Sequence, residues 1–282
     1  MVLTPGPLVF KFGGELLEEV PRLEVVVGAM ARVAAAQAQA PLAIVHGGGR
    51  EIDGALKLAG IEKRQVDGLR ITDEATLDVV VSVLAGAVNT RFVAALAMAG
   101  VAAVGLTGAD DGCGLSEPAP PNRAVDGRVV DLGRVGIPSS QASMRLFTTL
   151  FAGHFVPVIA SLGLGRDGKL FNVNADTFAG HLAGRLRARR LVIAGTTPGV
   201  IDDAGQTVGV LEPTVIGRLI HGGTATAGMV AKLRASEHAL AHGVGDVLIV
   251  DGRDLAALEA AAFDAAPPNA TRIVQATVER PL

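Results

Sequence analysis

The chain has 282 residues, 49% of them hydrophobic and 19% charged, so it can bury a large core in one domain or two lobes. The net charge of −3 and the lack of any run of Lys or Arg argue against a nucleic-acid partner, and a single cysteine, Cys113, excludes an internal disulfide. The start of the chain lacks the features of a signal peptide, and no uninterrupted apolar stretch looks long enough to cross a bilayer. We therefore expect a cytoplasmic protein without membrane contacts.

Short apolar runs alternate with segments of helical length along the chain. The runs that resemble strands are Leu8 to Phe12, Leu42 to Val45, Ala102 to Leu106, Val156 to Ala160, Leu191 to Ala194 and Val247 to Val250. This alternation predicts an α/β fold, namely a three-layer αβα sandwich around a mostly parallel central sheet.

Other segments interrupt this alternation. The Ala-rich stretch from Asp73 to Ala99 predicts one long helix or a helix pair, with Asp73 as its N-cap. Gly and Asp separate short apolar stretches in residues 111–136 and 163–174, which predicts β-hairpins that form a lid beside the parallel sheet. A division near Asp176 would give an N-terminal lobe of residues 1–176 and a C-terminal lobe of residues 177–282.

Two of the predicted strands end in glycines. Gly13 and Gly14 follow the first strand, and Gly47, Gly48 and Gly49 follow the second. A strand that enters a helix through glycines brings free backbone N–H groups and the positive helix end to one point, where an anion can bind. Ordinary tight turns between strand and helix are the alternative for either motif alone.

Lysine is scarce in this chain. Only five of the 25 basic residues are Lys, and two of these, Lys11 and Lys232, lie beside glycines. A compact, mobile ammonium group can follow a phosphoryl group in transfer better than the planar guanidinium of Arg can. Lys11 and Lys232 are therefore the candidates for phosphate chemistry.

A third glycine-rich segment, from Gly163 to Lys169, matches the G-x-G-x-x-G pattern and most of a Walker A loop. Both motifs require a helix next, and Walker A also requires Ser or Thr where this chain has Leu170. We interpret the segment as a hairpin turn.

Six motifs occur in a fixed order along the chain. They are Phe10-Lys11-Phe12-Gly13-Gly14, Val45-His46-Gly47-Gly48-Gly49, Gly68-Leu69-Arg70-Ile71-Thr72-Asp73, Gly105-Leu106-Thr107-Gly108, Phe171-Asn172-Val173-Asn174-Ala175-Asp176-Thr177 and Gly228-Met229-Val230-Ala231-Lys232. This series resembles the amino acid kinase family, over about Leu8 to Arg253.

The resemblance implies an activity. It implies transfer of the γ-phosphoryl group of ATP to the side-chain carboxylate of N-acetyl-L-glutamate, which gives N-acetyl-L-glutamyl 5-phosphate in the second step of arginine biosynthesis. Two alternatives stay open, namely N-acetyl-2-aminoadipate as the acceptor and a non-catalytic nucleotide or amino-acid sensor on the same fold. One methylene is typically worth only ~1–3 kcal/mol of discrimination, so the sequence does not decide between the two acceptors.

The resemblance also implies roles for individual residues. Lys11 and Lys232 would stabilise the transition state from opposite sides, and Asp176, which could instead be a helix N-cap, would hold both ammonium groups in place. Arg70 would bind the α-carboxylate of the acceptor through its bidentate fork. The other acceptor-binding residues implied are Gly48, Gly49 and Asn172.

ATP binding is assigned in the same way. The residues implied are Gly13, Gly14, Thr196, Thr197, Pro198, Gly199, Val200, Ile201, Thr224, Ala225 and Thr226. Thr196 and Thr197 depart from the family's usual pair of Ser or Thr followed by Asp, because the acidic residue is missing here. Mg²⁺ would be held mainly by the ATP phosphates, because no cluster of carboxylates with the spacing of metal ligands occurs. The N-terminal lobe would bind the acceptor and the C-terminal lobe would bind ATP.

Assembly is the last expectation. Arginine-inhibited hexamers of the family carry an extra N-terminal helix, whereas only seven residues precede Leu8 here. We expect a homodimer through the helical surface between Asp73 and Ala99, without inhibition by arginine.

Overall fold

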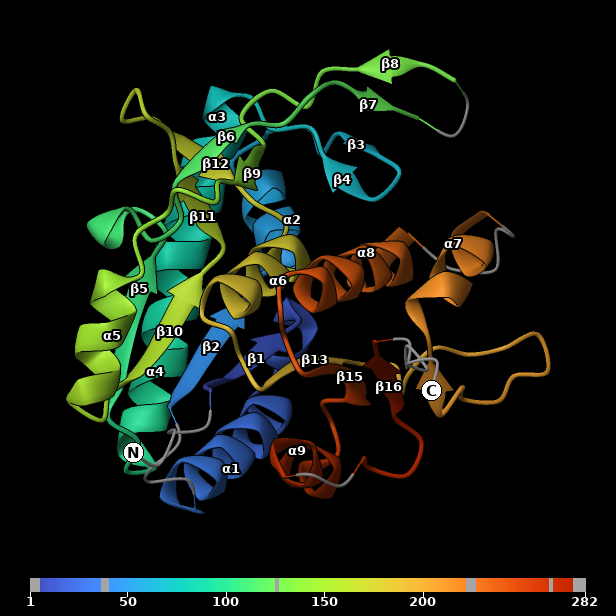
Figure 1. The fold of residues 1–282 in the computed structure, drawn as a ribbon. Coiled ribbons are helices and arrows are strands. Elements are labelled where there is room, and N and C mark those ends of the chain that lie inside the picture. Colours follow the sequence, from blue (N-terminus) through green and yellow to red (C-terminus); the bar gives the residue numbers. More distant parts are fainter. Residues whose placement is uncertain (1–5, 37–40, 125–126, 222–226, 264–265, 276–282) are drawn as a thin grey trace.

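A single sheet runs through the molecule in the computed structural model, which describes residues 6–36, 41–124, 127–221, 227–263 and 266–275 (Figure 1). The strand order is β14 (Val210–Leu211), β16 (Thr271–Val274), β15 (Asp246–Asp251), β13 (Arg190–Gly195), β1 (Leu8–Phe12), β2 (Leu42–His46), β10 (Val156–Ala160) and β5 (Ala103–Thr107). From β15 to β5 all neighbouring strands are parallel, and β16 is antiparallel to β15. The six predicted strands are confirmed within one residue at each end, whereas β14 and β16, the two strands beyond β15 at one side of the sheet, were not predicted.

Helices cover both faces of this sheet, because successive residues of each buried strand point to opposite sides. Leu8, Phe10 and Phe12 of β1 pack into one core. The helices that contribute to that core are α1 (Val20–Ala36), α2 (Gly49–Leu58), α4 (Asn89–Met98) and α9 (Leu255–Ala262). Val9 packs into the other core, with α5 (Arg145–Ala152), α6 (Ala175–Arg185), α7 (Pro213–His221) and α8 (Ala227–Ala241). The predicted three-layer αβα sandwich is confirmed.

A continuous helical segment runs over Glu74–Met98 through α3 (Glu74–Val81), the π-helical turn η2 (Ser82–Val88) and α4. Asp73 caps it as predicted, since its Oδ1 accepts the Thr76 N–H at 2.9 Å. By length and composition this segment could cross a membrane, which the sequence analysis had excluded. Core helices of soluble proteins pass the same test, and Val88 and Phe92 lie fully buried against the sheet.

Small hairpins gather at one end of the central sheet (Figure 1). The antiparallel pairs are β3 (Gln65–Val66) with β4 (Leu69–Arg70), β6 (Ser116–Pro118) with β9 (Gly136–Pro138), β7 (Asn122–Arg123) with β8 (Val129–Val130), and β11 (Leu162–Leu164) with β12 (Leu170–Asn172). Gly168 has φ +79° in the turn between β11 and β12, so residues 163–169 form a hairpin as predicted. The hairpin of β3 and β4 was not predicted, although Asp67 and Gly68 both have positive φ in its two-residue turn. Two 3-10 turns complete the described elements, η1 (Gly14–Leu16) and η3 (Asp110–Gly112).

Candidate active site

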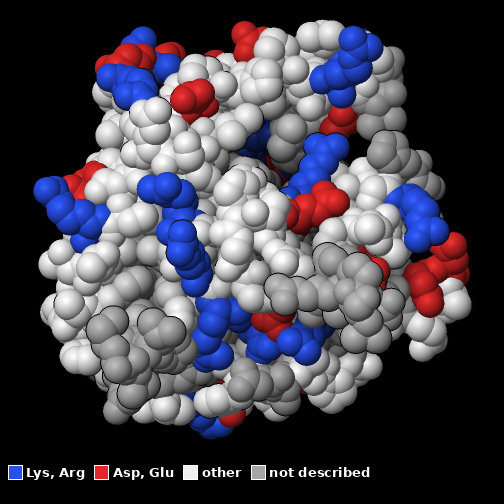
Figure 2. All heavy atoms as spheres, in the orientation of Figure 1, with Lys and Arg blue, Asp and Glu red and all other residues white. Residues whose placement is uncertain are grey.

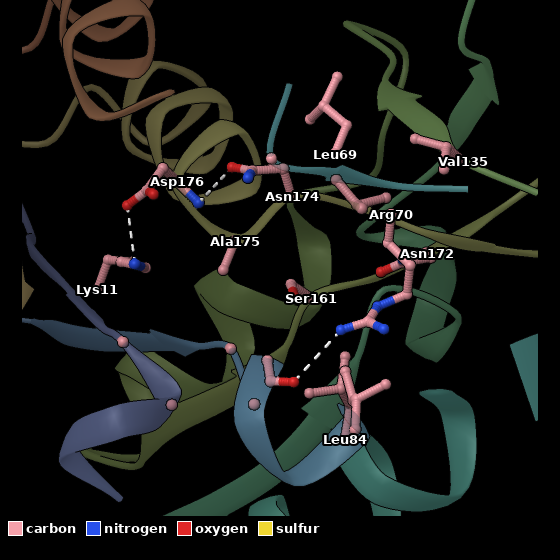
Figure 3. Close-up of a pocket in the computed structure, with 18 of the residues that line it drawn as sticks. Lys11, Leu69, Arg70, Leu84, Val135, Ser161, Asn172, Asn174, Ala175 and Asp176 are labelled. Carbon is pink, nitrogen blue, oxygen red and sulfur yellow. Dashed lines mark hydrogen bonds and ion pairs between the residues drawn. The ribbon is translucent and has the colours of Figure 1, made fainter. Parts of the chain in front are cut away.

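A cleft of about 240 Å³ lies where β1 and β2 end (Figure 3). Figure 2 shows a hollow on this face of the molecule, with charged side chains at its edge. The cleft is lined by Lys11, Gly13, Gly14, Glu15, Gly47, Gly48, Gly49, Ile52, Gln65, Gly68, Leu69, Arg70, Leu84, Val135, Ser161, Asn172, Val173, Asn174, Ala175 and Asp176. These residues come from both glycine turns, the hairpin of β3 and β4, and the segment between β12 and α6. Segments far apart in the sequence thus form one site.

The two glycine turns touch each other at the base of the cleft. A Cβ added to Gly14 would lie 2.5 Å from the Cα of Gly48, and a Cβ on Gly48 would lie 2.8 Å from Leu84. Only glycine allows this approach. Gly49 begins α2, so the first N–H groups of this helix have no partner inside it and can face an anion.

Lys11, Asp176 and Lys232 converge beside these turns from three elements. Nζ of Lys11, at the end of β1, lies 2.9 Å from Oδ1 of Asp176 in the first turn of α6, and both residues are buried. Lys232 comes from α8, which packs against α6, and its charge and that of Asp176 each affect the pKa of the other. The predicted catalytic residues therefore share one site.

Asn174, and not Asp176, caps the N-terminus of α6. The Asn174 Oδ1 accepts the N–H groups of Asp176 and Thr177, both at 3.0 Å, so Asn174 is the N-cap of α6. The sequence pattern suggests Asp176 for that cap and gives Asn174 no role, so the cap at Asn174 is a correction. Because Asn174 caps the helix, the carboxylate of Asp176 is left to the lysines.

Burial and neighbouring charges act in opposite directions on the pKa values of Asp176 and Lys232. Burial would raise the pKa of Asp176, but the charges of Lys11 and Lys232 outweigh it and hold that pKa below its usual 3.8. Burial also lowers the pKa of Lys232, an effect that Asp176 and Glu15 oppose and Lys11 reinforces. The arrangement places two cationic groups against one carboxylate in a desolvated site.

Arg70 and Asn172 lie on the other side of the cleft (Figure 3). Nη2 of Arg70 donates to Oδ1 of Asp53 at 2.5 Å and to the Gly49 carbonyl at 3.3 Å. Its Nη1 is buried and has no partner among the described residues. Nδ2 of Asn172 donates to the Thr72 hydroxyl at 3.1 Å, which leaves Oδ1 of Asn172 as a possible acceptor. A cationic N–H and an amide oxygen are thus both available to a polar ligand.

The predicted nucleotide loop follows β13 directly. The Val200 N–H donates to the Thr271 hydroxyl at 2.8 Å, and its carbonyl accepts the Val208 N–H at the same distance. Val200 is also 3% exposed, so it packs on the inside of the loop, and its part in nucleotide binding stays a prediction. Ligand contacts by the other loop residues (Thr196, Thr197, Pro198, Gly199 and Ile201) stay predictions. Thr224, Ala225 and Thr226 lie outside the described residues.

His46 lies directly beneath the second glycine turn but is not placed for acid–base catalysis. The Asn89 amide Nδ2 lies 2.9 Å from both Nε2 of His46 and the Val158 carbonyl, so Nε2 must accept and the ring is neutral. Burial lowers the pKa of His46 to about 4, which keeps it neutral at physiological pH. Its role is structural.

Several cleft residues were missed by the sequence analysis. Glu15, Ser161, Leu69, Leu84 and Val135 line the cleft, but none of them belongs to the predicted site. Glu15 and Leu69 had a local signal, because Glu15 directly follows Gly13 and Gly14 and Leu69 lies in the motif from Gly68 to Asp73. The other three reach the cleft only through tertiary folding.

The site combines two ammonium groups around a carboxylate with glycine N–H groups at the carboxyl edge of a parallel sheet. This combination is typical of a site that transfers a charged group between two anions. The chain belongs to the amino acid kinase family, whose model matches residues 6–251.

Comparison with individual proteins agrees with this assignment. The chain is 40% identical over 246 residues to the acetylglutamate kinase of Methanopyrus kandleri. The aligned region covers 86% of this chain and 94% of that protein. It is 41% identical over 219 residues to the acetylglutamate kinase of Novosphingobium aromaticivorans, covering 74% and 72% of the two chains. Among solved structures, smu.665 of Streptococcus mutans shares the fold with a TM-score of 0.78 at 24% identity, over 95% of this chain and 98% of that one.

Proposed function

We propose that this protein is an acetylglutamate kinase, which transfers the γ-phosphoryl group of ATP to the side-chain carboxylate of N-acetyl-L-glutamate in arginine biosynthesis. The observation that carries the proposal is the ion pair of Lys11 and Asp176 in the cleft, with Lys232 beside it, together with the unpartnered Nη1 of Arg70 on the other side of the cleft. Family membership and two relatives named acetylglutamate kinase support it.

The attacking group needs no general base. The side-chain carboxylate of the acceptor is already ionised at neutral pH, so catalysis reduces to alignment of two anions and neutralisation of the charge on the transferred phosphoryl group. Lys11 and Lys232 supply that neutralisation, and Asp176 holds the Lys11 ammonium in position. A complete set of these groups favours an enzyme over the alternative of a non-catalytic sensor.

Arg70 binds the acceptor at the opposite end of the cleft. Its Nη1 is oriented for the α-carboxylate, and Asn172 offers an amide group beside it. The N–H groups at the start of α2 face the transferred group, and the turn at Gly13 and Gly14 faces the ATP phosphates. In this assignment residues 1–176 bind the acceptor and residues 177–282 bind ATP.

Magnesium enters with the nucleotide. No group of three or more His, Cys, Asp or Glu side chains in the described ranges is placed to hold a metal ion by itself. A site with few protein ligands suits Mg²⁺, because this ion keeps several waters and binds through one or two carboxylates together with phosphate oxygens. When bound, the ion neutralises charge on the phosphates.

Acceptor-dependent ATP consumption tests the proposed function. Purified enzyme is assayed with ATP, Mg²⁺ and either N-acetyl-L-glutamate or N-acetyl-2-aminoadipate, and the acyl phosphate is trapped with hydroxylamine. We expect a higher kcat/KM with N-acetyl-L-glutamate. A higher value with the longer acceptor would reassign the substrate, and ATP binding without turnover on either acceptor would indicate the sensor.

Assembly and location complete the proposal. The outward face of the helical segment Glu74–Met98 exposes small and apolar residues, among them Ala94, Ala97 and Met98, the last 89% exposed. Pairing of this face with a second copy gives a homodimer, the commonest closed symmetry. Light scattering with refractive-index detection, needed because the chain has no Trp or Tyr, measures the mass in solution. We place the enzyme in the cytoplasm, which cell fractionation tests.

A further inference from the structure

One carboxylate stands where the phosphates are expected. Glu15 belongs to η1, directly after Gly13 and Gly14, and lines the cleft. A Cβ added to Gly13 would lie 2.3 Å from both carboxylate oxygens of Glu15, so this side chain folds back over the glycine turn. The proposed phosphoryl transfer assigns no role to Glu15.

Glu15 lies beside Lys232. A Cβ added to Gly195, at the end of β13, would lie 3.5 Å from Oε1 of Glu15 and 3.9 Å from Nζ of Lys232. The Glu15 charge also opposes the loss of the proton of Lys232. Within the described residues the carboxylate of Glu15 has no ion pair within 4.0 Å and no hydrogen bond, and only its main-chain carbonyl is used, by Arg22 at 3.1 Å. The carboxylate is therefore free to bind a ligand.

Charge balance indicates what that ligand is. Lys11 and Lys232 contribute two positive charges, and Asp176 and Glu15 contribute two negative charges, so this end of the cleft is close to neutral. A triphosphate that entered it alone would meet the carboxylate of Glu15 with like charge. A divalent cation between the two removes this repulsion, and Mg²⁺ prefers a carboxylate oxygen together with phosphate oxygens.

We propose that Glu15 is a protein ligand of the divalent cation that accompanies the nucleotide, either directly or through one water of the cation. The inference rests on the proposed function, because it requires a nucleotide in the cleft. Glu15 then makes nucleotide binding dependent on the metal, since the same carboxylate attracts the complexed nucleotide and repels the free one.

Calorimetric titration of a non-hydrolysable ATP analogue, once with excess Mg²⁺ and once with EDTA, measures this dependence without turnover. The wild type is compared with Glu15→Gln, and with Glu18→Gln as the matched control, because Glu18 is exposed and outside the cleft. The metal dependence is the dissociation constant in EDTA divided by the dissociation constant in Mg²⁺. We expect this ratio to fall by about 10-fold or more in Glu15→Gln, the usual effect of losing a group that supports a metal. Glu18→Gln should leave the ratio unchanged.

Glu15→Asp, which keeps a shorter carboxylate, should give an intermediate ratio and guards against a variant that folds poorly. A ratio in both Glu15 variants equal to that of Glu18→Gln would overturn the inference. Equal strengthening of binding with and without Mg²⁺ would also overturn it, because Glu15 would then only repel the nucleotide. Failure of the wild type to bind the analogue with Mg²⁺ would overturn the proposed function itself.

Discussion

Asp53 holds one arm of the Arg70 guanidinium and leaves the other arm for the cleft. The Asp53 Oδ1 accepts Nη2 of Arg70 at 2.5 Å, while its Oδ2 accepts Nζ of Lys63 at 2.6 Å. Burial raises the pKa of Asp53 and is the largest single effect, but the hydrogen bonds and charges of Lys63 and Arg70 together outweigh it and hold that pKa below its usual 3.8, so this carboxyl is ionised at neutral pH. The ion pair joins α2 to the hairpin of β3 and β4, and it fixes the orientation of Arg70 before any ligand binds.

Replacement of Asp53 by Asn should therefore weaken acceptor binding. A charge-assisted hydrogen bond is worth about 1.5–3 kcal/mol, so we expect KM for the acceptor to rise by about 10-fold or more. KM for ATP should change little, because Asp53 acts only through Arg70. Steady-state kinetics with each substrate varied in turn measures both constants.

Two further variants serve as controls for Asp53→Asn. Lys63→Gln removes the other, more exposed partner of Asp53 and should leave KM for the acceptor near the wild-type value. Arg70→Lys, which loses the fork, should raise KM for the acceptor at least as much as Asp53→Asn does. If Asp53→Asn raised KM for ATP alone, the assignment of Arg70 to the acceptor would be wrong.

Loss of either lysine should affect the chemical step. We expect Lys11→Ala or Lys232→Ala to lower kcat by at least ~100-fold, the usual effect of removing one preorganised donor to the transition state. Circular dichroism and thermal melting serve as the control for folding. A variant that kept near-normal kcat would show that its lysine does not contact the transferred group.

The N-cap at Asn174 should couple stability to catalysis. Asn174→Ala removes the acceptor of the Asp176 and Thr177 N–H groups, which should cost about 1 kcal/mol of unfolding free energy. It should also lower kcat, because the first turn of α6 carries Asp176. Chemical denaturation and steady-state kinetics measure the two effects.

Asp254→Ala is the matched control for this cap. Asp254 caps α9 by accepting the N–H groups of Ala256 and Ala257 at 2.9 and 3.2 Å, and it is not among the cleft residues. Its loss should cost similar stability and leave kcat unchanged. Equal kcat in the Asn174 and Asp254 variants would mean that Asn174 does not position Asp176.

Much of the sheet could be predicted from the sequence, because strands buried on both faces are continuous apolar runs such as Leu42 to Val45. The two short strands β14 and β16 at one side of the sheet could not. In β16, Thr271 and Ile273 are buried while Arg272 and Val274 are half-buried, and so short an alternation is typical of many loops. The hairpin of β3 and β4 has only two residues in each strand, too few for a periodic signal.

The candidate site also contains residues that the sequence predicts and residues that it does not. Lys11, Arg70 and Asp176 lie in local motifs that a sequence displays directly. Asp53 and Ser161 carry no such motif, and only packing of α2 and the end of β10 brings them to the cleft or to Arg70. For Asp176 the local rules for helix caps suggested a second role that the side chain of Asn174 fills instead.

His46 should make the protein less stable in mild acid. The ring is fully buried and neutral, with a pKa of about 4 compared with 6.5 in an unfolded chain. Between these pH values the unfolded chain binds a proton that the folded protein does not, so stability falls as the pH falls from 6.5 to 4. The shift corresponds to a loss on the order of 3 kcal/mol at the lower pH.

Urea unfolding at several pH values from 7.5 to 4.5 measures this loss. His46→Gln should be less stable at pH 7.5 but should show a shallower fall with pH. His181, whose pKa burial also lowers to about 4, keeps part of the slope in that variant. His154→Asn is the control, because His154 is exposed and Asn tolerates its positive φ of 58°. If His46→Gln and His154→Asn lost stability with the wild-type slope, the neutral state of His46 would not be what limits the protein in acid.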